Sequence, residues 1–263
     1  MELAGQAESF RKRGIGVASV IPEPVATIKE FATGHGVAYP VLSDADAAII
    51  RRFGLVDHGF HATGDLVGKD IPYAATFLVD EHGVIREKFF EAAAENRRTT
   101  ASILVLQGAP GTGGQEVRGG HFTLRTSSSN AEVAPGQRFT LVLDFELEPK
   151  HHAYAPGVKG YRPLELQLDP DPLFEVHDTR YPPARTYYFA PLKETVPVFE
   201  GKFRLTRDVT VTLSGALPRF KDVEEFPATV SGTLRYQICS DVVCYPPATQ
   251  PLRWTVRIRK WVR

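Results

Sequence analysis

The feature that most limits the fold of this chain is a glycine-rich stretch, residues 108–120, which separates two regions of different pattern. Six of these thirteen residues are glycine and one is proline, a composition typical of a linker because glycine adds backbone freedom. We therefore predict a first domain over residues 1–107, a linker over 108–120, and a second domain over 121–263. A chain of 263 residues is long enough for two domains of ordinary size.

The first region alternates between helical and extended patterns. Residues 15–21 form an apolar run typical of a buried strand, and residues 22–35 place apolar side chains on one helical face. Residues 76–80 and 84–89 flank a turn at His82-Gly83 and predict a β-hairpin. Alternation of this kind predicts an α/β domain.

The second region consists of short segments of alternating polar and apolar residues, separated by proline, glycine and aspartate. Regular short strands with turn residues between them predict an all-β sandwich. The expected strands cover residues 122–126, 138–146, 164–168, 202–205, 209–213, 228–237 and 252–258.

Charge and hydropathy exclude several classes of function. The 31 basic and 31 acidic residues cancel, so nothing indicates a nucleic acid partner. No apolar run reaches the roughly 18 residues of a membrane span, and the first residues lack the pattern of a signal peptide. The glycine-rich stretch lacks the ending of a phosphate-binding loop, and His151 and His152 are interpreted as solvated loop residues. We therefore expect no cofactor and no metal, and the chain alone leaves its compartment open.

The only two cysteines, Cys239 and Cys244, are five positions apart. Two cysteines cannot complete a zinc tetrahedron. Residues 234–238 alternate between apolar and polar, which places Cys239 at the end of a strand, and Ser240-Asp241 predicts a turn. A disulfide needs Cα atoms only about 5.5–6 Å apart, so a chain that folds back here can bring the sulfurs together.

A disulfide in so short a loop stabilises a fold little, because the entropic gain grows with loop length. This favours reversible exchange over a structural role, although a structural bridge, free thiols or metal binding stay open. The neighbouring rings of Tyr236 and Tyr245 are candidates for shielding the sulfurs. Asp241, between the two cysteines, is expected to disfavour a thiolate unless a cation balances it.

Residues 14–90 resemble the thioredoxin-like redoxins, in particular the AhpC/TSA peroxiredoxins. The resemblance rests on residues 16–21, 30–32, 39–44, 52–54 and 75–80, followed by His82-Gly83. It implies a thioredoxin-like α/β fold that lacks its first central strand and its reactive cysteine, and Ala74 stands where the family has a cis-proline. The domain is either shortened at its N-terminus or naturally degenerate. Peroxidase activity would require a cysteine from upstream residues.

Residues 122–260 resemble the N-terminal periplasmic domain of the thiol:disulfide interchange protein DsbD. The specific pattern is Tyr-Gln-x-Cys at residues 236–239 and Cys-Tyr-Pro-Pro at 244–247, supported by residues 152–157. The resemblance implies an immunoglobulin-like sandwich outside the cytoplasm, whose cysteine pair takes electrons from a membrane electron donor and passes them to thioredoxin-like proteins. It also implies an aromatic cap over the disulfide from residues 185–190, for which Phe189 and Tyr188 are the candidate rings, and a less exposed Cys244.

We therefore predict a thiol–disulfide exchange protein with Cys239 and Cys244 as its catalytic residues. One alternative is a non-catalytic interaction scaffold in which the disulfide is structural. The other is a peroxiredoxin-type peroxidase, if upstream residues supply the cysteine that the first domain lacks.

Overall fold

The computed structural model describes residues 2–59, 70–91, 96–189 and 193–260. The chain divides into two compact units, unit 1 (Met1–Thr100) and unit 2 (Ala101–Arg263). The boundary therefore lies seven residues before the predicted end of the first domain.

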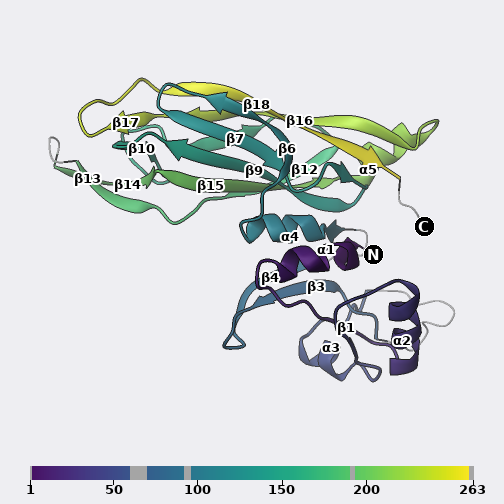
Figure 1. Cartoon of the computed structure of the whole chain (residues 1–263). Coiled ribbons are helices and arrows are strands. Elements are labelled where there is room, and N and C mark those ends of the chain that lie inside the picture. Colours follow the sequence, from purple (N-terminus) through teal and green to yellow (C-terminus); the bar gives the residue numbers. More distant parts are fainter. Residues whose placement is uncertain (1, 60–69, 92–95, 190–192, 261–263) are drawn as a thin grey trace. The chain divides into compact units, whose positions relative to one another are not determined.

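Unit 1 is an α/β unit, as predicted, but its strands form two separate pairs. Strands β1 and β2 are parallel, and β3 and β4 form an antiparallel hairpin. Within the described residues, no strand pairs one couple with the other. The elements of unit 1 are α1 (Glu2–Arg11), β1 (Ser19–Ile21), α2 (Val25–Gly34), β2 (Val41–Ser43), α3 (Ala48–Arg52), β3 (Ala74–Val79), β4 (Ile85–Glu91) and β5 (Arg97–Arg98) (Figure 1).

The core of unit 1 is small because its sheet is not continuous. Phe10, Ile28 and Ile50 are buried, one from each of the three helices. By contrast, Val20 of β1 and Leu42 of β2 remain 39% and 49% exposed. Apolar side chains therefore stay uncovered on the parallel pair.

Unit 2 is a β-sandwich, which confirms the predicted all-β fold. Its sheets have the strand orders β12-β15-β9-β7-β6, β11-β16-β18-β8 and β13-β14-β10-β17. Every pairing on these paths is antiparallel except that of β18 with β8. The elements are α4 (Thr100–Leu106), β6 (Thr112–Arg118), β7 (Phe122–Ser128), β8 (Glu132–Val133), β9 (Gln137–Leu147), β10 (His151–Tyr154), β11 (Glu165–Leu168), β12 (Phe174–Arg180), β13 (Arg185–Phe189), β14 (Glu194–Glu200), β15 (Lys202–Val211), α5 (Leu213–Ala216), η2 (Leu217–Phe220), β16 (Glu225–Tyr236), β17 (Ile238–Ser240) and β18 (Ala248–Arg259).

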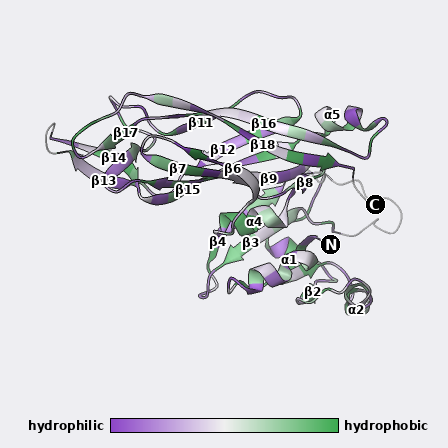
Figure 2. Cartoon of the chain, turned by 45° about the horizontal axis from the view of Figure 1, so that its top comes forward, coloured by the Kyte–Doolittle hydropathy of each residue, from purple (hydrophilic) through white to green (hydrophobic). Residues whose placement is uncertain are grey.

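The sandwich is held together by the period-2 alternation of its strands. In β18, Trp254, Val256 and Ile258 are buried while the intervening Arg257 and Arg259 are exposed. Figure 2 shows hydrophobic and hydrophilic residues alternating along the strands of this unit. Because successive side chains of a strand point to opposite faces, one face of each sheet supplies the core.

The predicted linker is in part a strand, because Thr112–Arg118 form β6 and pair with β7. The glycines here allow a close approach of two backbones. Gly114 has φ +105°, and a Cβ at this position would lie 1.6 Å from the carbonyl oxygen of Thr126. The β6–β7 register shifts between Thr112 and Gln115, so Gly113 and Gly114 form a bulge within the sheet.

Among the residues that the structure describes, no helix has the length and apolarity needed to cross a membrane.

Candidate functional site

The candidate site is a disulfide between Cys239 and Cys244 in a tight hairpin that follows β17. Their Cα atoms are 4.1 Å apart. Two backbone hydrogen bonds close the hairpin, from the Ser240 N–H to the Val243 carbonyl (2.8 Å) and from the Tyr245 N–H to the Ile238 carbonyl (3.0 Å). The predicted turn at Ser240-Asp241 and the predicted pairing of the cysteines are therefore both present.

The hairpin lies at one end of the sandwich, with β10, β13 and β14, while α5 lies at the other end (Figure 1). Only Cys239 belongs to a strand, and its register partner in β10 is His152. This pairing brings the sulfurs beside residues that are about 85 positions away in the sequence.

The two sulfur-bearing residues differ sharply in exposure. Cys239 is 0% exposed, whereas Cys244 lies at the surface. The expectation that Cys244 is the less exposed cysteine is therefore wrong. Cys239 is covered because it sits in a strand and packs with Tyr154, Val196 and Val198, while Cys244 follows the hairpin tip, where Val242 is 83% exposed.

The hydroxyl of Tyr154 lies within hydrogen-bond distance of both sulfurs. It is 3.2 Å from the Sγ of Cys239 and 3.4 Å from the Sγ of Cys244. The ring of Tyr154 stacks on Tyr161 with centroids 4.3 Å apart, and the Tyr161 hydroxyl donates to Glu194 (2.9 Å). Burial raises the pKa of Tyr154 well above its ordinary value, so this hydroxyl stays protonated and can donate to a thiolate.

Tyr187 and His152 form the second wall beside the disulfide. Their rings are 4.5 Å apart, and the Tyr187 hydroxyl donates to Asp241 at 3.0 Å. His152 is only 2% exposed, which corrects the interpretation of it as a solvated loop residue, since β10 carries it into the sandwich. Burial lowers the pKa of His152, against the opposing effect of Asp241, so its ring is neutral at pH 7.

The structure places the four predicted shielding rings in different surroundings. Tyr236 and Tyr245 pack against the main core of the sandwich. Tyr188 is 59% exposed and Phe189 ends β13, while Ala190 of the predicted cap segment lies outside the described residues. Tyr187 of the same segment is the ring that packs against the cluster around Cys239.

Sequence reasoning missed Tyr154 as a member of the site. Residues 152–157 were noted for their pattern alone, and no local signal tied the tyrosine to the cysteines. The signal that identifies it is the register of β10 against β17, in which Ala153 pairs with Ile238.

Comparison with known proteins gives two family matches, which do not overlap. Residues 1–88 match the AhpC/TSA family, and residues 124–253 match the family described as thiol:disulfide interchange protein DsbD, N-terminal. Both agree with the resemblances read from the sequence.

Among solved structures, the chain is similar to the N-terminal periplasmic domain of ScsB from Proteus mirabilis. The identity is 14% and the TM-score 0.38, over 52% of this chain and 49% of that chain. The chain thus spans about half the length of that structure. No curated protein matches this chain.

Proposed function

Because the chain joins an AhpC/TSA-family segment to a DsbD N-terminal-family segment, we propose that it exchanges electrons between protein thiols through the Cys239–Cys244 disulfide. The observation that carries the proposal is the asymmetry of the pair. One sulfur-bearing residue is at the surface and the other is buried, with a protonated tyrosine hydroxyl within reach of both.

This asymmetry assigns a role to each cysteine. A partner thiolate attacks the Sγ of Cys244, a disulfide forms between the partner and Cys244, and the bond to Cys239 breaks. The electron pair of the broken bond goes to Cys239, which leaves as a thiolate beside the Tyr154 hydroxyl. A second partner thiol then attacks the partner's own sulfur and releases Cys244. Overall, two electrons and two protons reach the pair, and the partner is left with a disulfide.

The surroundings of the sulfurs favour the developing thiolate by hydrogen bonding. Charge-assisted hydrogen bonds are roughly twice as strong as neutral ones. The Tyr154 hydroxyl bonds both sulfurs, whereas Asp241, the acidic residue between the cysteines, accepts from Tyr187. The expected repulsion between this carboxylate and a thiolate is therefore reduced by a neighbouring donor.

Unit 1 has no cysteine, so the exchange that we propose depends on unit 2. The partners are expected to be thioredoxin-like proteins or a membrane electron donor, in the periplasm, as the family of unit 2 implies. Tyr187, with Phe189 and Tyr188 from the same strand, is proposed as the surface beside the disulfide that a docked partner contacts.

The proposal is tested by trapping mixed disulfides with an immobilised thioredoxin-like protein that lacks its own resolving cysteine and whose remaining cysteine is bonded to thionitrobenzoate, which the free thiol of the chain displaces as the mixed disulfide forms. The Cys239→Ser chain retains the exposed thiol and is expected to form a stable mixed disulfide. The Cys244→Ser chain retains only the buried thiol and is expected to form far less. Equal trapping by both variants contradicts the assigned roles.

Equilibration of the wild-type chain with glutathione buffers separates exchange from a structural bridge. Structural disulfides of secreted proteins have potentials below about −300 mV, and labile ones lie higher. A potential well below that value supports the scaffold alternative and rejects the proposal.

A further inference from the structure

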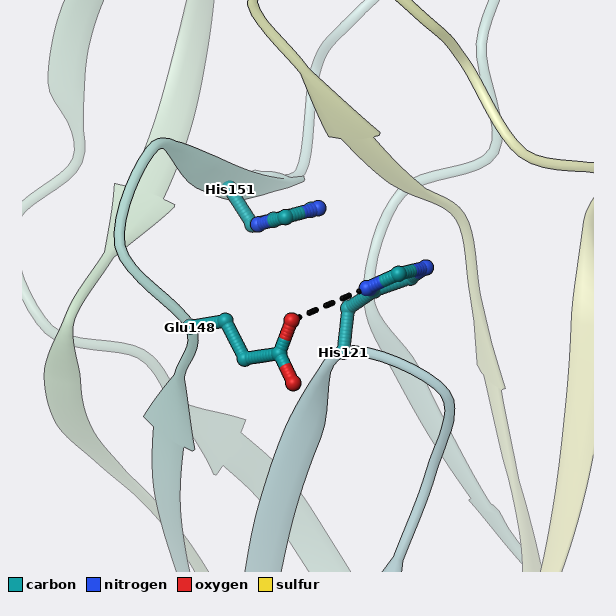
Figure 3. A group of neighbouring side chains, drawn as sticks. All are labelled: His121, Glu148 and His151. Carbon is teal, nitrogen blue, oxygen red and sulfur yellow. Dashed lines mark hydrogen bonds and ion pairs between the residues drawn. The ribbon is translucent and has the colours of Figure 1, made fainter.

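A cluster of three potential metal ligands lies in unit 2, outside the disulfide and the residues that touch its sulfurs. His121 precedes β7, Glu148 follows β9, and His151 begins β10. One ligand atom from each residue lies within 4.8 Å of the other two. Figure 3 shows the carboxylate of Glu148 directed at the ring of His121, with the ring of His151 beside them.

Backbone hydrogen bonds fix the two turns that carry these side chains. The Glu148 N–H donates to the His121 carbonyl (3.0 Å), and the His151 N–H donates to the Glu148 carbonyl (3.1 Å). The rings of His121 and His151 are parallel, with centroids 4.4 Å apart, and Tyr245 stacks on the ring of His121 at 4.2 Å. The three side chains are therefore held near one another before any ligand binds.

The hydrogen bonding of His151 is that of a metal ligand. Its Nδ1 lies 3.1 Å from the carbonyl oxygen of Pro149. Because a carbonyl oxygen only accepts, Nδ1 is the donor in this contact, and in the neutral ring the lone pair is then on Nε2. Within the described part of the chain, this Nε2 is buried and has no hydrogen-bond partner. Histidines that bind metals typically donate their other ring N–H to a carbonyl or a carboxylate in this way.

We propose that His121, Glu148 and His151 bind a divalent transition-metal ion that prefers imidazole ligands, of the zinc and nickel class. Imidazole suits such ions, and two histidines with one carboxylate are an established ligand set for Zn²⁺. With three protein ligands, a fourth position stays open to water. The inference does not rest on the redox function proposed for the cysteines.

The spacing of the ligands needs only a small adjustment. Three atoms within 4.8 Å of one another lie within about 2.8 Å of a common point. Bonds from Zn²⁺ to nitrogen or oxygen are about 2.0–2.2 Å long, so each ligand atom has to move inwards by less than about 1 Å. The hydrogen bond of 3.0 Å between His121 Nδ1 and Glu148 is replaced, because the ion takes the place of the shared proton.

The test is calorimetric titration of Zn²⁺ into the full chain, without a histidine tag and with its disulfide intact. Zn²⁺ has no redox chemistry and leaves the cysteine pair unchanged. We expect one ion per chain, and at least a tenfold weaker affinity, a loss of the order seen when metal sites lose a supporting group, for Glu148→Gln and for His151→Gln.

Two matched variants control for non-specific binding. Glu146→Gln removes a carboxylate from β9 outside the cluster, and His82→Gln removes an exposed histidine from unit 1; both are expected to bind Zn²⁺ like the wild type. Glu148 is exposed, so Glu148→Gln is not expected to disturb folding, which circular dichroism checks. The proposal is overturned if millimolar Zn²⁺ gives no binding, or if the cluster variants bind as tightly as the wild type.

Discussion

Replacement of Tyr154 by phenylalanine removes one oxygen atom and tests the part of the site that sequence reasoning did not identify. The ring and its stacking on Tyr161 are retained, and the residue is 3% exposed. The lost hydroxyl lies 3.2 Å and 3.4 Å from the two sulfurs. In the reduced protein, a thiolate therefore loses one hydrogen-bond donor.

The expected magnitude follows from the strength of that hydrogen bond. A hydrogen bond to a charged group contributes about 1.5–3 kcal/mol, and one pKa unit corresponds to about 1.36 kcal/mol. The thiol pKa is therefore expected to rise by about 1–2 units. The thiolate fraction at pH 7 falls roughly tenfold per unit, but the remaining thiolate is more nucleophilic, with a Brønsted coefficient of about 0.4–0.5. The net loss of exchange rate at pH 7 is roughly 3- to 16-fold.

The thiol pKa is measured from the pH dependence of the alkylation rate of the reduced protein and, independently, from the ultraviolet absorbance of the thiolate. Tyr181→Phe serves as the control, because the hydroxyl of this half-buried tyrosine contacts Thr179 and Leu166 and neither sulfur. If Tyr154→Phe leaves both the thiol pKa and the exchange rate at wild-type values, the hydroxyl does not stabilise the thiolate and our mechanism for the site is wrong.

Three further predictions concern the fold and the approach of a partner. Gly114→Ala is expected to lower the free energy of unfolding by about 3 kcal/mol, because its Cβ would meet the backbone of Thr126. The control Gly113→Ala, whose Cβ meets open space, is expected to lower it by only about 1–2 kcal/mol. Equal losses for the two variants in urea titrations would contradict the presence of the bulge. The pKa of buried His152 lies below its ordinary value, so below pH 6.5 or so the unfolded chain binds a proton that the folded chain does not. The free energy of unfolding is therefore expected to decrease as the pH falls below about 6.5. Urea titrations between pH 5 and pH 7.5 should show a smaller change of this free energy with pH for His152→Gln than for the wild type. Val242→Ser removes an exposed apolar side chain beside Cys244 without adding a charge. Stopped-flow exchange with a thioredoxin-like partner should become slower while the reduction potential stays constant, and an unchanged rate would show that the partner does not contact this tip.

The local elements were predictable because their signals are local. The apolar alternation of β16 and the turn after Cys239 lie within a few residues of one another, and the spacing of the cysteines allows them to pair. The start of α3 is also held by a contact between residues close in sequence, because the carboxylate of Asp44 accepts the N–H groups of Ile49 and Ile50.

The features that the sequence could not provide depend on strand register and on contacts between distant segments. Tyr154 reaches the sulfurs only because β10 pairs with β17. Which residue of β13 packs against the cluster around Cys239 depends on which side of the strand faces it, and this residue is Tyr187. The glycine content of residues 108–120 is as typical of a linker as it is of a bulged strand. Composition cannot distinguish a flexible backbone from a backbone that lies close to another strand, because both are favoured by the absence of a Cβ.

Unit 1 shows the same limit at the level of the sheet. Each strand was recognisable by its apolar residues, and the absence of a cysteine was certain from the sequence. The two strand pairs, β1–β2 and β3–β4, are separate. This separation was expected only through the resemblance to a family in which another strand lies between them.

The hairpin around Cys239 and Cys244 has a consequence for the speed of the chemistry. Its backbone hydrogen bonds at Ser240 and Tyr245 do not involve sulfur, so they persist when the covalent link opens. We therefore expect the backbone of this hairpin to be nearly the same in the oxidised and the reduced protein, so that exchange requires little rearrangement of the segment. We expect the rate of exchange to depend on how often a partner encounters exposed Cys244 rather than on a motion of the hairpin.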